Sequence, residues 1–198
     1  EQVRNDNSRR LWTSRLAEPA GGAWSASRFR DHCLQHMADD FSSCVGFITR
    51  LHGNLLDGLK KAVALGAIRQ RFDDDTAYTH HDPRIAAVVA AVPFAADFDM
   101  ASLAQPRVPL GLVTAAQDVN QVPRFHSSAV LAACGPCTRV AEFADGSHGV
   151  MLSPMPPDAV LSDTARALLG DPPGFDRPAG VARLNASVLR FFGQHLLP

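Results

Sequence analysis

The sequence lacks the features that would select a charged or membranous partner. Its 198 residues carry 19 Lys and Arg against 20 Asp and Glu, so the formal net charge is −1 and no basic excess indicates nucleic-acid binding. No apolar run approaches the roughly 20 residues that span a bilayer. The polar N-terminus, EQVRNDNSRRLW, lacks the apolar core of a signal peptide. We therefore expect no nucleic-acid partner and no membrane span.

The chain also begins without an initiator Met, so either a leader was removed or the sequence belongs to something longer. What is present suits a packed core, because 46% of the residues are hydrophobic and 20% are charged. We expect one, partial, domain over 1–198. It comprises an irregular segment over 1–28, a helical segment over 29–82, and strands, loops and a last helix over 83–198.

Apolar spacing predicts the helices. From Phe47 to Val63 apolar residues recur close to a 3.6-residue period within the helical segment. The stretch FDDDTAYTHHDP then reads as a loop that ends at a proline. Residues 123–134 form a plausible short helix. Residues 178–196 are strongly amphipathic, and Pro178 stands near the start, where proline is favoured.

Three short apolar runs predict strands. Residues 84–92 and 108–114 are almost continuously apolar, which is typical of strands buried on both faces. Residues 138–143 alternate more and favour a position near a sheet edge. Strands alternating with helices and loops indicate an α/β fold, doubly wound around a parallel sheet.

Chemistry in such sheets lies on the loops that follow the strands, and two candidate residues stand there. Asp118 follows the second predicted strand and His148 follows the third. The order acid then histidine matches the Ser…Asp…His order of α/β-hydrolases. The carboxylate would orient the imidazole, which would shuttle the proton of a nucleophile. The alternative is that Asp118 caps a helix and His148 is a turn residue.

Several segments carry a more specific resemblance. DPRIAAVVAAVPF, RVPLGLVTAAQD, EFADGSHGVML and DPPGFDRPAGVARLNASVLRFFGQHL resemble the bacterial "predicted dienelactone hydrolase" group, α/β-hydrolases related to the platelet-activating-factor acetylhydrolases. The resemblance covers roughly 29–198, with DPPGFDR and SHGVML its most telling parts. It implies an α/β-hydrolase-like parallel sheet with flanking helices, a catalytic Asp118–His148 pair and no cofactor.

The sequence departs from this group at the nucleophile. The group has a G-x-S-x-G elbow upstream of its paired-cysteine segment, and this chain has none. Ser25 stands in a comparable place without the glycines. We therefore expect the N-terminal strands and the nucleophile upstream of this C-terminal part. Ala115-Ala116-Gln117 replaces the group's Gly-Glu before the acid, so Asp97 and Asp99 remain alternatives to Asp118.

The cysteines form two pairs. The segment from Cys33 to Cys44 resembles the paired-cysteine segment of the group, and its polar loop ADDFSS can fold back, so we expect these two residues close enough for a disulfide. Cys134-Gly135-Pro136-Cys137 spells a thioredoxin-type C-x-x-C motif. It follows a predicted helix and precedes a strand, the reverse of the redox context, which favours a turn.

The resemblance, together with the order of Asp118 and His148, implies a carboxylic ester or lactone hydrolase that acts through an acyl-enzyme on a small-molecule substrate. The alternatives are a catalytically inactive α/β-hydrolase-like domain used for binding or assembly, and a thiol oxidoreductase at the C-x-x-C motif. Acidic and histidine residues in 73–82 could suggest a metal site, but adjacent side chains seldom converge on one ion, which favours a solvated loop. The paired cysteines and the resemblance favour a periplasmic or secreted location.

Overall fold

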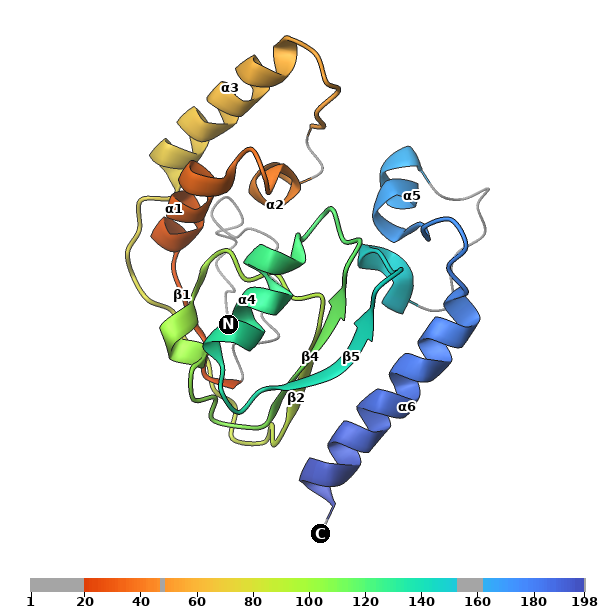
Figure 1. Cartoon of the computed structure of the whole chain (residues 1–198). Coiled ribbons are helices and arrows are strands. Elements are labelled where there is room, and N and C mark those ends of the chain that lie inside the picture. The colour runs from red at the N-terminus through yellow and green to blue at the C-terminus, as the bar shows by residue number, and fades with distance from the viewer. Residues whose placement is uncertain (1–19, 47–48, 153–161, 198) are drawn as a thin grey trace, which may run out of the picture.

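The computed structural model describes residues 20–46, 49–152 and 162–197, and a parallel three-stranded sheet lies at its centre (Figure 1). The strands are β2 (Val88–Ala91), β4 (Leu110–Ala115) and β5 (Thr138–Phe143), in the order β2-β4-β5. All six residues of β4 are buried, because it is the central strand. β5 lies at an edge of this sheet, as its alternating sequence predicts.

The first two strands begin later than the sequence predicts, and each delay has a local cause. The predicted strand over 84–92 starts only at Val88, because a turn closed by the Ile85 N–H and the Asp82 carbonyl precedes it. The predicted strand over 108–114 starts at Leu110, directly after Pro109, which has no N–H to give to a ladder.

Helices cover both faces of the sheet, α4 (Ser127–Ala133) on one and α6 (Arg177–Leu196) on the other (Figure 1). Alternate residues of β4 face opposite layers. Leu110 and Leu112 pack in one core cluster with Val130 of α4. Val113 packs in another with Leu184 of α6. The observed architecture is therefore mixed α/β, with a parallel sheet between flanking helices.

The first residues that the structure describes, from Ala20 onward, form more regular secondary structure than the sequence predicts. Over 1–28 the prediction of irregular structure is wrong from Ala23 onward, and 1–19 lie outside the described residues. β1 (Ala23–Trp24) pairs antiparallel with β3 (Phe98–Asp99), a two-residue partner that no periodicity could reveal. Helix α1 (Ala26–His36) follows at once, because the Ser25 hydroxyl caps it by accepting the Arg28 N–H at 3.3 Å.

The helical segment contains two further helices, α2 (Phe41–Val45) and α3 (Leu56–Arg71). The continuous apolar period from Phe47 to Val63 does not correspond to one helix. Gly46 takes a φ of 61° and ends α2, a left-handed conformation that glycine adopts without strain. Phe47 and Ile48 lie outside the described residues.

The remaining elements are short. The predicted helix over 123–134 is a 3₁₀ turn, η3 (Pro123–Phe125), followed by α4. Three further elements, all short helices, have no counterpart in the sequence-based prediction: η2 (Met100–Leu103), η4 (His148–Met151) and α5 (Asp163–Leu169). The predicted last helix is confirmed as α6. Within the part of the chain that the structure describes, no helix has both the length and the apolarity to cross a membrane.

Two disulfides fasten the fold. Cys33 of α1 is bonded to Cys44 of α2 with 5.6 Å between the Cα atoms, which confirms the predicted closeness. Cys134 and Cys137 are bonded across the turn between α4 and β5, with 5.4 Å between the Cα atoms. The C-x-x-C motif thus follows a helix C-terminus, the context opposite to that in which a helix dipole lowers a thiol pKa.

The two disulfides should contribute unequally to stability. Cross-linking residues 11 apart removes more chain entropy from the unfolded state than cross-linking residues 3 apart. We expect Cys33→Ala/Cys44→Ala to lower the free energy of unfolding by about 3 kcal/mol, and Cys134→Ala/Cys137→Ala by about 2 kcal/mol. Urea titrations under non-reducing conditions measure both. The reverse order would mean that native packing, rather than loop length, sets the contributions.

Candidate functional site

The loops after β4 and β5 meet at one edge of the sheet, because the carboxyl ends of parallel strands lie side by side. Asp118 lies in the turn after β4, and His148 begins η4 after β5. Backbone hydrogen bonds join the loops: the Ala116 N–H donates to the Phe143 carbonyl at 2.8 Å, and the Gln117 N–H donates to the Gly146 carbonyl at 2.9 Å. The sheet therefore fixes the separation of the two functional loops.

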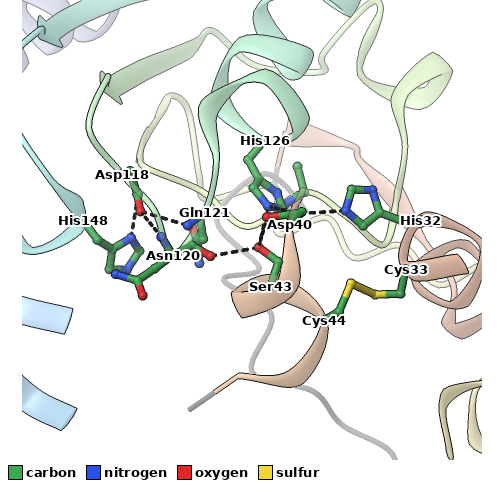
Figure 2. Close-up of polar contacts among 11 residues, drawn as sticks. His32, Cys33, Asp40, Ser43, Cys44, Asp118, Asn120, Gln121, His126 and His148 are labelled. Atoms are coloured by element: carbon green, nitrogen blue, oxygen red, sulfur yellow. Dashed lines mark hydrogen bonds and ion pairs between the residues drawn. A yellow bond between two sulfur atoms is a disulfide. The ribbon is translucent and has the colours of Figure 1, made fainter. Parts of the chain in front are cut away.

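Asp118 and His148 are in direct contact (Figure 2). His148 Nδ1 lies 2.8 Å from Asp118 Oδ2, and the Asp118 side chain is fully buried. The other carboxylate oxygen, Oδ1, accepts the N–H groups of Asn120 and Gln121, each at 2.9 Å. Three donors thus hold the carboxylate in one orientation. The structure brings together the two residues that the sequence analysis singles out.

This geometry leaves the other imidazole nitrogen of His148 available. The Asp118 carboxylate can only accept at this distance, so Nδ1 carries a proton and the lone pair of the neutral ring is on Nε2. The His148 side chain keeps 20% of its surface exposed. Within the described residues Nε2 has no hydrogen-bond partner. The pair can therefore take a proton from a group that approaches Nε2.

The DPPGFDR and SHGVML segments also meet in space. Arg177, the last residue of DPPGFDR, is buried and bonded to Asp171, the first, with 2.9 Å from Nε to the carboxylate. Its guanidinium also donates to the carbonyls of Gly149, Leu152 and Leu169. Because Gly149 follows His148 directly, Arg177 anchors the histidine loop to the start of α6.

Gly149 has a steric reason to be glycine. A Cβ at this position would lie 2.4 Å from the Cα of Leu169, at the end of α5. Beside it, the Ser147 hydroxyl donates to the Gly170 carbonyl at 2.9 Å. The two residues that flank His148, Ser147 and Gly149, therefore pack against the end of α5, and this contact positions the imidazole between them.

Replacing Arg177 should loosen this loop and cost stability. Arg177→Ala removes a charged donor from three backbone carbonyls and from Asp171, and we expect a loss of about 2–4 kcal/mol in the free energy of unfolding. Arg177→Lys should recover only part of it, since an ammonium cannot reproduce the planar fork. Urea unfolding measures both, with exposed Arg190→Ala of the same helix as the control. Equal losses at Arg177 and Arg190 would contradict the anchoring role.

The alternative residues lie elsewhere, near the start of α1. Asp99 caps η2 and forms an ion pair with Arg28 at 3.0 Å. The Asp97 carbonyl accepts the Ser25 N–H at 3.0 Å, and the Ser25 hydroxyl lies 3.1 Å from that of Ser27. Asp118, rather than Asp97 or Asp99, is thus the carboxylate that the structure places against His148.

Two acidic residues of 73–82, Asp74 and Asp82, take part in local turns. The Asp74 carboxylate accepts the Thr76 N–H at 2.9 Å and the Tyr78 hydroxyl at 3.1 Å. The Arg84 guanidinium, hydrogen-bonded to Asp82, lowers the pKa of that carboxyl to about 2. Within the described ranges no three His, Cys, Asp or Glu side chains are grouped to hold a metal ion.

A second buried polar cluster lies beside the acid loop, and the sequence analysis missed it. Asp40 contacts His32 and His126, at 2.7 and 3.0 Å, and accepts the Ser43 hydroxyl at 2.8 Å (Figure 2). Burial alone would raise the pKa of Asp40, but the hydrogen bonds from His126, His32 and Ser43 hold it well below its ordinary value. The one sequence signal is position: His32 and Ser43 adjoin the disulfide cysteines.

Comparisons with models of known protein families, with curated proteins and with solved structures each found no match, so the chemistry of this site rests on the geometry of its own residues.

Proposed function

We propose that this chain carries the acid and the base of a carboxylic ester or lactone hydrolase of the α/β-hydrolase type. The observation that supports it is the Asp118–His148 pair: a buried carboxylate fixed by two backbone amides, bonded to Nδ1 of an imidazole whose Nε2 is partly exposed. Its place at the carboxyl edge of a parallel sheet, on successive loops in the order acid then histidine, fits the same function.

In this proposal His148 Nε2 accepts the hydroxyl proton of a serine nucleophile as the serine oxygen attacks the carbonyl carbon of the ester. The tetrahedral adduct collapses when the imidazolium returns that proton to the alcohol oxygen, which leaves with the bonding pair. Water then attacks the acyl-enzyme, again losing a proton to Nε2. The second tetrahedral adduct collapses as the bond from the acyl carbon to the serine oxygen breaks, the imidazolium returns its proton to that oxygen, and the acid product is released. Asp118 stays ionised throughout and stabilises the imidazolium.

The nucleophile of the proposal lies upstream of Glu1, since no G-x-S-x-G occurs in the 198 residues. Ser25, which lies between β1 and α1, uses its hydroxyl to cap α1. The oxyanion hole would come with the upstream elbow.

Hydrolysis of p-nitrophenyl acetate tests the proposal. We expect the 198-residue chain to act hardly faster than free imidazole, because it supplies a base without a nucleophile or an oxyanion hole. The protein extended by its upstream coding sequence should turn over the ester and react with a serine-directed phosphonate. His148→Ala should abolish most of that turnover, and exposed His80→Ala should not.

Other outcomes would contradict parts of the proposal. Ordinary enzyme rates from the 198-residue chain, with phosphonate sensitivity, would place the nucleophile within it, and Ser25 would be the first residue to mutate. An extended protein with neither an elbow nor turnover would favour the inactive binding or assembly domain.

A further inference from the structure

The buried cluster around Asp40 is held together by several hydrogen bonds, but it takes no part in the proposed proton transfer. The Asp40 and His126 side chains are at most 1% exposed, and His32 is 12% exposed. Asp40 Oδ2 receives both imidazoles, while Oδ1 receives the Ser43 hydroxyl. A buried carboxylate that lost these donors would be left unpaired, so the cluster defines one arrangement of α1, α2 and the start of α4.

Ser43, His126 and Asp40 are the residue types of a triad, but the hydrogen bonds exclude that function. The Ala95 N–H donates to His126 Nδ1 at 3.0 Å, so in the neutral ring Nδ1 accepts and Nε2 carries the proton. Nε2 lies 2.8 Å from the Ser43 oxygen and 3.0 Å from Asp40. His126 therefore donates towards Ser43 and cannot take its proton.

Ser43 connects this cluster to the acid loop. Its single hydroxyl proton is shared between Asp40 Oδ1, at 2.8 Å, and the Asn120 carbonyl, at 2.9 Å, and Figure 2 shows the second contact bridging the two groups of residues. Asn120 in turn donates its own N–H to Asp118 Oδ1. One hydroxyl thus joins the buried cluster to the turn that holds the carboxylate facing His148. The Cys33–Cys44 disulfide joins α1 to α2 covalently, at positions adjacent in sequence to His32 and Ser43.

We propose that Asp40, Ser43 and His126 are positioning residues that hold the Asp118 turn in register with His148. The proposal rests on the proposed function, because it assigns these residues to the preorganisation of the same acid–base pair. Ser43 restrains the carbonyl of the peptide that joins Asn120 to Gln121, and the Gln121 N–H of that same peptide donates to Asp118 Oδ1, so that Asp118 Oδ2 stays on Nδ1 of His148. Asp40 and His126 act through Ser43, which they hold between them.

The Nδ1 proton of His148 provides a test that needs no turnover. Its exchange with water is measured by NMR on isotope-labelled histidine, with the signal assigned by its loss in His148→Gln. We expect Ser43→Ala to speed this exchange at least about fivefold, the factor set by one ordinary hydrogen bond. The Asn120 and Gln121 amides should exchange faster in parallel. Ser43→Thr, which keeps a hydroxyl, should remain near the wild-type rates.

Ser27→Ala is the matched control, because Ser27 is similarly buried and its substitution also removes a side-chain hydrogen bond, the one with Ser25 at the start of α1. It should leave the His148 proton unchanged even where its urea midpoint falls as far as that of Ser43→Ala. Unchanged exchange in folded Ser43→Ala, or the same acceleration in Ser27→Ala, would overturn the positioning role. Absence of ester hydrolysis would count against the proposed function alone.

Discussion

Asp118→Asn is expected to lower kcat for ester hydrolysis by about 10⁴ in the protein extended by its upstream segment, with little change in folding. The backbone amides of Asn120 and Gln121 require an acceptor at the position of Oδ1. The asparagine oxygen must take that place, so its NH₂ group faces His148 Nδ1. The imidazole would then hold its proton on Nε2, and the base would be blocked.

The measurement is the rate of p-nitrophenyl acetate hydrolysis, compared with exposed Asp145→Asn in the histidine loop. Asp145→Asn removes the same charge without touching the imidazole, so it should retain nearly the wild-type kcat. Equal effects of the two substitutions would show that net charge at this edge, rather than the tautomer of His148, governs the rate.

Asp40→Ala is expected to cause the largest loss of stability, about 3–5 kcal/mol in the free energy of unfolding at neutral pH. The substitution leaves two imidazoles and one hydroxyl without their shared acceptor in the core. Urea unfolding followed by circular dichroism measures it. Asp39→Asn is the control, since the ion pair of Asp39 with Arg124 is exposed on both sides and should contribute below about 1 kcal/mol.

The difference in the free energy of unfolding between the wild type and Asp40→Ala should become smaller at acidic pH. The folded pKa of Asp40 is lower than its unfolded value of about 3.9, so unfolding binds a proton as the pH falls below that value. The contribution of the charged carboxylate is thus complete above about pH 4 and is lost towards the folded pKa. Wild type and Asp40→Ala should converge in stability below about pH 4. A constant difference would mean that Asp40 is not the charged partner of the two histidines.

The sequence predicted much of the sheet because its signals are local. Continuous apolar runs mark strands covered on both faces, and the residues after them define the functional edge. Asp118 and His148 could be singled out in this way, since parallel strands necessarily bring their carboxyl ends together. β1 and β3 could not, because two residues carry no period, and their pairing depends on segments more than 70 residues apart.

What the sequence alone determined is the set of elements that local patterns encode: the parallel strands, the amphipathic α6 and the two loops with their acid and histidine. What only the tertiary structure decided is which side chains share one environment. Spacing cannot bring Arg177 to Gly149 or Ser43 to Asn120, because these hydrogen bonds span 28 and 77 positions and exist only after the layers have packed. Buried polar groups must find partners, and the packed fold, rather than the local chain, supplies them.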